Sequence, residues 1–220
     1  MGFKRLLIAS LTSVLASATL VIPMTASHAT VLQPIEMPGT GHFYQLIPAQ
    51  QSWNQSLADA SQSSFNGLRG HLATITSQAE QNFLQSAFSQ YRDIVIGGGD
   101  VGASGSNARV FKWLAGPDAG QVVSTCTHAL DASSCTEVAY AAWARSMGQP
   151  DGSGNHLMFN WNGDANGWDD VIDSWLVAGN GSGYLIEYET GTWQDISVSI
   201  PSVPLHVHVT ESSSSSVTLV

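Results

Sequence analysis

Residues 140–170, which are the most informative part of the sequence about the fold, read YAAWARSMGQPDGSGNHLMFNWNGDANGWDD. This stretch belongs to a longer segment, from about residue 117 to about residue 180, that is rich in Gly, Asp, Asn and Ser and has few periodic apolar runs. A loop of this length is uncommon in a compact domain and is usually functional. We therefore expect the segment to carry the site, and the regular secondary structure to lie before and after it.

Working outward, the sequence predicts two helices before this segment. Trp53, Leu57 and neighbouring apolar residues recur at helical spacing over 52–65. Ser77, followed three residues later by Glu80, has the form of a capped start to a second helix. Strands are predicted over 42–47, 71–75, 93–96, 110–114 and 183–188. Helices near the start, strands and a long polar loop together predict an α+β domain.

The two ends of the chain differ from its middle. Residues 1–29 have the order of a secretory signal: Lys4 and Arg5, an apolar run, then small residues before a cleavage after Ala29. Polar residues interrupt that run, and no other stretch is apolar for the ~20 residues that a membrane span needs. We expect a secreted protein, extracellular or periplasmic, with a lead-in over 30–40, one domain over 41–189 and a partly flexible, Ser-rich tail over 190–220.

The chain is acidic, with 7 Lys+Arg, 17 Asp+Glu and a formal net charge of -10. Such a surface repels phosphate backbones, which argues against nucleic-acid binding, and it attracts cations. No Lys or Arg follows Arg145, yet five aspartates gather beyond it: Asp151, Asp164, Asp169, Asp170 and Asp173. Carboxylates without basic partners repel one another unless they are solvated, protonated or bridged by a cation. A solvated acidic loop and a calcium site both fit the composition.

Two cysteines, Cys126 and Cys135, lie close together in the sequence. In an exported chain such a pair predicts one disulfide that closes a surface loop. A zinc site with His128 as a third ligand is the alternative, although no fourth ligand lies nearby. Neither cysteine stands beside a basic residue, which argues against a catalytic thiol.

Two spacings among the acidic residues suggest calcium, which takes six to eight oxygen ligands. In the first, Asn162, Asp164 and Asn166 alternate before Gly167, with Asp173 beyond, as in a calcium-binding loop. In the second, Gln149-Pro150-Asp151 is followed by Trp168-Asp169-Asp170.

The second set belongs to a series of motifs that occur in a fixed order. They are Gly41-His-Phe-Tyr44, Gly70-His-Leu-Ala-Thr-Ile75, Ile94-Val-Ile-Gly-Gly-Gly-Asp100, Phe111-Lys-Trp113, Tyr140-x-x-Trp143, Gln149-Pro-Asp151, Trp168-Asp-Asp170 and Gly183-Tyr-Leu-Ile-Glu-Tyr188. In this order, residues 41–189 resemble a C-type lectin-like domain of the kind found in bacterial exported proteins. The resemblance implies two helices, small antiparallel sheets and a long polar loop.

The resemblance also implies a calcium ion on the long loop, shared directly with sugar hydroxyls. Pro150 would follow a cis peptide bond, which turns the side chains on either side of it the same way. Asn155 stands where the family usually has Glu, with His156 as the neighbouring option. The implied ligands are Gln149, Asp151, Asn155, Asp169 and Asp170.

The same resemblance implies roles for aromatic and apolar residues around these ligands. The Gln-Pro-Asp order resembles that of members that prefer galactose-type sugars, although no aromatic ring follows the motif here. Trp161 is either a sugar platform or a core residue, and Trp168 is expected beneath the site. Leu157 and Ile186 occupy positions where the family has cysteines, so packing is expected to replace those bridges.

The function that these observations favour is an exported, calcium-dependent protein that binds a glycan or simple sugar. The alternative is a lectin-like module for adhesion or protein recognition that works without metal. An enzyme is not expected, because no GxSxG or HExxH motif occurs, and Asp169 and Asp170 are adjacent in sequence rather than opposed across a cleft. The sequence does not specify an oligomeric state.

Overall fold

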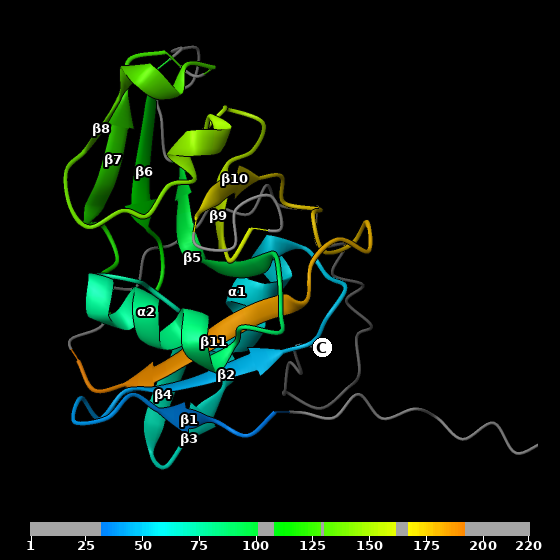
Figure 1. Cartoon of the computed structure of the whole chain (residues 1–220). Coiled ribbons are helices and arrows are strands. Elements are labelled where there is room, and N and C mark those ends of the chain that lie inside the picture. Colours follow the sequence, from blue (N-terminus) through cyan, green and yellow to red (C-terminus); the bar gives the residue numbers. More distant parts are fainter. Residues whose placement is uncertain (1–31, 101–107, 129, 162–166, 192–220) are drawn as a thin grey trace, which may run out of the picture. The chain divides into compact units, whose positions relative to one another are not determined.

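The computed structural model describes residues 32–100, 108–128, 130–161 and 167–191 (Figure 1). The predicted signal, the segment from 192 onward and residues 162–166 of the long loop lie outside the described residues. The helices are α1 (Trp53–Gln62) and α2 (Gln78–Ala87), with short 3₁₀ turns at Ala132–Ser134 and Arg145–Met147. The strands are β1 (Ile35–Glu36), β2 (Phe43–Ile47), β3 (Ser64–Phe65), β4 (Leu68–Leu72), β5 (Ile94–Asp100), β6 (Arg109–Trp113), β7 (Val122–Cys126), β8 (Cys135–Glu137), β9 (His156–Phe159), β10 (Asp169–Val171) and β11 (Gly183–Glu189).

Strand β11 is the centre of the sheet. It pairs with β2 along one edge, whereas β5 and β4 share its other edge. The main path runs β1-β2-β11-β5-β6-β7-β8, and β9 and β10 branch from β5. All pairs are antiparallel except β11 with β5. The α+β class is confirmed, but the small antiparallel sheets that we expected are joined into one mixed, branched sheet.

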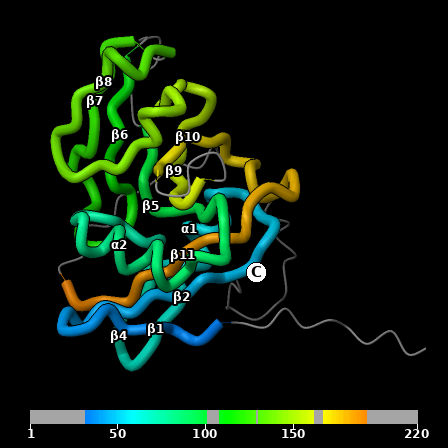
Figure 2. Tube along the Cα trace, viewed as in Figure 1, coloured from blue at the N-terminus to red at the C-terminus, as the bar shows by residue number. Residues whose placement is uncertain are grey.

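The two helices cover opposite faces of β11, as the ribbon and the Cα trace both show (Figures 1 and 2). Side chains alternate between the faces of a strand. Ile186 and its neighbours two residues away pack in one apolar cluster with Trp53 of α1, and Leu185 packs in the other with Leu84 of α2. Burial of such side chains, about 1.5–3 kcal/mol each, holds the helices against the sheet.

Both helices begin at a serine cap, which the sequence predicts for the second helix. The Ser52 side chain accepts the backbone N–H of Gln55, and the Ser77 side chain accepts that of Glu80. Glu80 reaches back beyond the cap, because its Oε2 accepts the N–H of Thr76 at 2.8 Å. Backbone donors that an unfinished helix end would leave unpaired are therefore satisfied.

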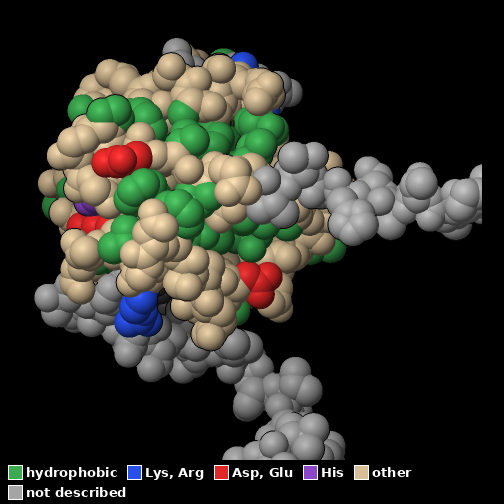
Figure 3. All heavy atoms as spheres, turned by 90° about the horizontal axis from the view of Figure 1, so that it is seen from below, with side chains coloured by type: hydrophobic (Ala, Val, Ile, Leu, Met, Phe, Trp, Pro, Cys, Tyr) green, Lys and Arg blue, Asp and Glu red, His purple; other side chains and the backbone are tan. Residues whose placement is uncertain are grey.

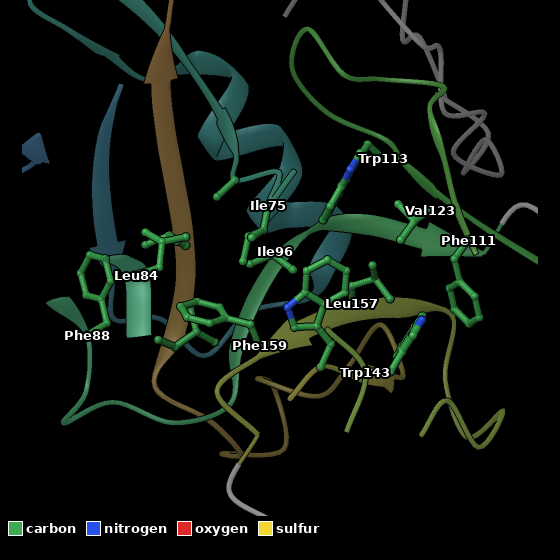
Figure 4. Packing of buried hydrophobic residues seen from close by; sticks show 14 of the residues in the cluster. Ile75, Leu84, Phe88, Ile96, Phe111, Trp113, Val123, Trp143, Leu157 and Phe159 are labelled. Carbon is green, nitrogen blue, oxygen red and sulfur yellow. The ribbon is translucent and has the colours of Figure 1, made fainter. Parts of the chain in front are cut away.

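Aromatic rings pack together beside strands β5, β6 and β9. Phe111, Trp113 and Trp143 lie in one buried cluster with Leu157 (Figure 4). Gly98 of β5 permits this packing, since a Cβ at that position would lie 2.4 Å from Leu157 Cδ1. Leu157 and Ile186 are both buried, in agreement with the expectation that packing replaces bridges at these positions.

The long polar segment has more regular structure than its sequence predicts, because it contains the strands β7, β8, β9 and β10. Conversely, the predicted strand over 71–75 ends at Leu72. The predicted disulfide is confirmed: Cys126 and Cys135 face each other across β7 and β8 and are bonded. Because both cysteines are in the disulfide, neither has a thiolate that could bind zinc, and the alternative of a zinc site with His128 is wrong.

The surface carries few charges, in keeping with a composition that is 11% charged. On the face shown in Figure 3, acidic and basic side chains are isolated among hydrophobic and uncharged groups. Within the described residues, no helix has the length and apolar character needed to cross a membrane.

A buried network of ionisable side chains lies where β11 pairs with β2 and β4. Glu187 stands opposite Tyr44 of β2 and His71 of β4. Its Oε1 lies 2.7 Å from His42 Nδ1 and accepts the Tyr44 hydroxyl at 2.9 Å, and its Oε2 accepts the Thr74 N–H at 3.1 Å. Burial opposes the charge of Glu187, but these hydrogen bonds and the nearby histidines outweigh it and lower its pKa.

Tyr44 joins this network to helix α2. Its hydroxyl lies 2.8 Å from Glu80 Oε1 as well as 2.9 Å from Glu187 Oε1. A hydroxyl donates one proton, so one of these two contacts needs a proton from the carboxyl group. Burial and the charge of Glu187 raise the pKa of Glu80 to about 7, so Glu80 is the carboxyl group that supplies this proton when it is protonated, at and below about neutral pH.

The charge on His42 makes stability depend on pH above neutrality. The hydrogen bond to Glu187 raises the pKa of His42 from 6.5 to about 9. The stabilisation is therefore complete below pH 6.5 and is lost as the pH rises toward 9. In urea unfolding at constant low salt, we expect the free energy of unfolding to fall by about 1 kcal/mol between about pH 7.5 and about pH 9.5, after allowance for solvent screening of this partly exposed ring. His42→Gln should remove most of this slope, and an unchanged slope would contradict the assignment.

Candidate metal and ligand site

The site is built on residues 149–155, which fold around the carboxylate of Asp170. The Gln149–Pro150 peptide bond is cis, as the resemblance implies. Asp170 is fully buried. Its Oδ1 accepts the N–H of Asp151 at 2.9 Å, and its Oδ2 accepts the N–H of Gly154 at 3.1 Å. A residue of β10 thus fixes the turn of the loop.

The loop can approach β10 this closely only because residue 154 is glycine. A Cβ at Gly154 would lie 2.0 Å from the carbonyl carbon of Val171. The backbone of the next residue completes the contact, since the Asn155 N–H donates to the Val171 carbonyl at 3.0 Å. Gly154, the second glycine after the Gln-Pro-Asp motif, is therefore required by packing.

Three carboxylates converge at this point: Asp151, Asp169 and Asp170 each offer an oxygen, and these oxygens lie within 4.8 Å of one another. Two oxygens bound to one calcium ion at roughly 2.3–2.6 Å are at most about 5 Å apart, so the spacing fits a shared ion. Asp169 and Asp170 are buried, whereas Asp151 is exposed and closes the cluster on the solvent side. Hard oxygen donors of this kind suit calcium.

The electrostatics of the cluster favour a cation. Burial, and then the charge of Asp170, raises the pKa of Asp169 to about 7. Burial also raises the pKa of Asp170, although the N–H groups that it accepts from Gly154 and Asp151 and the charge of Arg109 oppose this. Two buried neighbouring carboxylates are thus costly to ionise without a positive charge nearby.

Gln149 lies at the cluster, as expected. Its Oε1 accepts the same Asp151 N–H that Asp170 Oδ1 accepts, each at 2.9 Å. The two oxygens are therefore neighbours, and Gln149 is in position to add an amide oxygen to the three carboxylates.

Asn155 is placed differently from the expectation. Its Oδ1 accepts a hydrogen bond from Arg109 Nη1 at 3.0 Å. Arg109 Nη1 also lies 4.0 Å from Asp170 Oδ2. The expectation that the acidic loop has no basic partner is thus wrong, because Arg109, distant in sequence, comes from β6. The neighbouring option, His156, stacks on Trp53 instead, with ring centroids 4.2 Å apart.

The two tryptophans of the segment have packing roles in the structure. Trp168 is buried, and its Nε1 donates to Gln81 Oε1 of α2 at 2.8 Å. It holds the strand that carries Asp169 and Asp170 against helix α2. Trp161 is half-buried and packs against the apolar cluster around Trp53, which agrees with the core role; its contact with sugar stays a prediction.

Three ligands of the alternative calcium loop, Asn162, Asp164 and Asn166, lie outside the described residues. Its distal carboxylate, Asp173, has a structural task. Asp173 Oδ1 accepts the Asn54 N–H at 3.0 Å, and the Asp173 carbonyl accepts the Trp53 N–H at 2.8 Å, so this residue anchors the start of α1.

Sequence comparison finds one curated relative of interest, while no protein-family model matches the chain. Over 151 residues, or 67% of the chain, it is 30% identical to Halomucin from Haloquadratum walsbyi (strain DSM 16790 / HBSQ001). The matched part is 1% of that protein's length.

Comparison with solved structures finds C-type lectin-like domains. The chain is similar to the C-type lectin CEL-I from Cucumaria echinata, with 20% identity, coverage of 68% of this chain and 91% of that chain, and a TM-score of 0.43. For human lithostathine the corresponding values are 13%, 71%, 97% and 0.47. For the mouse scavenger receptor C-type lectin carbohydrate-recognition domain they are 14%, 73%, 97% and 0.47.

Proposed function

We propose that this chain, which has a C-type lectin-like fold, is an exported carbohydrate-binding protein that uses calcium. The ion is held by Asp151, Asp169 and Asp170, with Gln149 as a further ligand. The observation that carries the proposal is the convergence of three carboxylate oxygens within 4.8 Å, two of them on buried residues.

In this mode the ion binds two neighbouring hydroxyls of a sugar. Calcium accepts more oxygens than these residues supply, so positions remain for ligand hydroxyls. The Gln-Pro-Asp order supports a sugar of the galactose type, as the resemblance implies. Trp161 is half-buried and is our candidate for the ring that meets the apolar face of the sugar.

The calcium half of the proposal is tested with Asp151→Ala. Asp151 is exposed, and its side chain accepts the Ser153 N–H at 2.8 Å. Calorimetry of the wild type should show calcium binding, and calcium at one hundred times Kd should raise the free energy of unfolding by about 2.7 kcal/mol. In Asp151→Ala the heat and the thermal shift should disappear, while stability in chelator stays within about 0.5 kcal/mol of wild type.

Asp59→Ala is the matched control, because Asp59 is an exposed carboxylate on α1, remote in sequence from the cluster. It should leave calcium binding unchanged. If the wild type shows neither heat of binding nor a thermal shift at millimolar calcium, the proposed calcium site is refuted. The sugar half is tested separately on the calcium-loaded protein with galactose-type and mannose-type sugars. Binding that survives chelator would refute the proposed mode.

A second candidate function is recognition without metal. It is favoured by the bonding of the loop, in which Asp170 already accepts the N–H groups of Asp151 and Gly154 and has a guanidinium nearby. A loop that is ordered without an ion does not need one to present a surface. Chelator then leaves both the melting temperature and ligand binding unchanged.

A further inference from the structure

Arg109, at the start of β6, makes several contacts with the proposed site. Its Nη2 donates to the Gly152 carbonyl at 2.9 Å, and its Nη1 donates to the Gly154 carbonyl and to Asn155 Oδ1. Three acceptors on one short loop are thus held by a single guanidinium. The planar fork of arginine suits this task, since it presents five donors in a fixed geometry.

The charge of Arg109 is also placed among carboxylates. Its Nη1 lies 3.4 Å from Asp100 Oδ2 and 4.0 Å from Asp170 Oδ2, and the side chain is 13% exposed. Asp100 is itself fixed, because its Oδ1 accepts the Val110 N–H at 2.9 Å and its N–H donates to the Asn155 carbonyl at 2.7 Å. A positive charge therefore stands at the edge of the acidic cluster without any added ion.

We propose that Arg109 is an internal cation that orders residues 149–155 in the metal-free protein and opposes the binding of a metal there. The guanidinium takes the Asn155 oxygen, which would otherwise be available to an ion. It also brings a like charge close to the position that three carboxylates define, and like charges at this range repel. The ordering part stands on the contacts alone; the opposing part rests on the proposed calcium site.

Loss of the arginine should therefore have two opposite effects. Without metal, residues 149–155 lose the donors that fix the carbonyls of Gly152 and Gly154, and their amide hydrogens should exchange faster. With calcium, removal of the positive charge should tighten binding by about tenfold. A residue with a merely structural role would weaken both loop order and calcium binding when it is replaced.

The experiment compares full-length wild type with Arg109→Gln, Arg109→Lys and Lys112→Gln, the last as a matched loss of one positive charge on the same strand. Hydrogen exchange of the peptide covering 149–155 is followed in chelator and in calcium, and the calcium Kd is measured by calorimetry. We expect Arg109→Gln to exchange at least about fivefold faster in chelator and to regain protection in calcium. Arg109→Lys keeps the charge but loses the fork. It should have a mobile loop with calcium binding as weak as in wild type.

The inference is overturned if Arg109→Gln keeps wild-type exchange in chelator, or if it binds calcium no more tightly than wild type and Lys112→Gln. The two proposals fail in distinguishable ways. If no variant binds calcium, the calcium site and the opposing role of Arg109 are both refuted, while exchange in chelator still decides whether Arg109 orders the loop.

Discussion

Replacing Glu187 by alanine should lower the free energy of unfolding by about 3–5 kcal/mol at neutral pH. Glu187 is only 2% exposed and accepts hydrogen bonds from the Tyr44 hydroxyl and the Thr74 N–H. Its charge also faces His42 at 2.7 Å and His71 at 3.9 Å. Its removal takes the acceptor from the buried Thr74 N–H and leaves the Tyr44 hydroxyl with Glu80 and the two histidines with Glu189. The loss of a buried charge from this network costs more than the loss of an exposed contact. Urea unfolding followed by tryptophan fluorescence measures the change.

Two further variants separate the effect of the charge of Glu187 on stability from the general effect of losing an ion pair. Glu187→Gln keeps the shape but cannot accept at both ends, so we expect it to lose less stability than Glu187→Ala. Glu137→Ala breaks an exposed ion pair with Arg145, and should cost at most about 1 kcal/mol. A loss in Glu187→Ala no larger than that in Glu137→Ala would show that the buried network does not support the fold.

Replacing Asp170 by alanine should abolish calcium binding and also destabilise the metal-free protein by about 3 kcal/mol. The carboxylate is fully buried and accepts the N–H groups of Asp151, Gly152 and Gly154, the second at 3.4 Å. Alanine removes this acceptor from the N–H groups of Gly152 and Gly154, and leaves the Asp151 N–H with Gln149 Oε1 alone. It also leaves Arg109 without one of its two acidic neighbours. Urea unfolding in chelator, with hydrogen exchange of the loop, measures the effect.

Asp151→Ala is the informative comparison for this variant. Both substitutions remove one ligand of the proposed ion, but only the Asp170 side chain accepts hydrogen bonds from several N–H groups of residues 149–155. Asp170→Ala should therefore be much less stable than Asp151→Ala in chelator. Equal stability of the two variants would mean that residues 149–155 are ordered by something other than the Asp170 carboxylate.

The sequence brought most of the candidate site into view because the proposed ligands belong to two short motifs. Gln149 and Asp151 flank one proline, and Asp169 and Asp170 are adjacent. Only the spatial proximity of the two motifs depends on the tertiary structure. Asn155 could not be placed in this way. Its side chain faces Arg109 at 3.0 Å, and nothing local indicates a partner 46 residues earlier.

The regular elements were predicted to different extents for similar reasons. Helix α2 follows from a cap and an apolar face within its own sequence, with Ser77 accepting the Glu80 N–H. Strands β7 to β10 are short, lie in a segment rich in polar residues, and form because each pairs with a neighbour. For example, Asp170 becomes part of β10 opposite Leu157 of β9. Pairing of this kind leaves little periodic signal in a short strand.

The sequence by itself determined the α+β class, both helix starts, the Cys126–Cys135 disulfide and the two motifs of the candidate site, because each depends on residues close together in the chain. The tertiary structure decided which charges meet. Pairing of β11 with β2 and β4 brings Glu187 between Tyr44 and His71, and pairing of β5 with β6 and β9 brings Arg109 to the acidic loop. Charge interactions act through space and depend on burial, so their partners follow from strand pairing rather than from sequence distance.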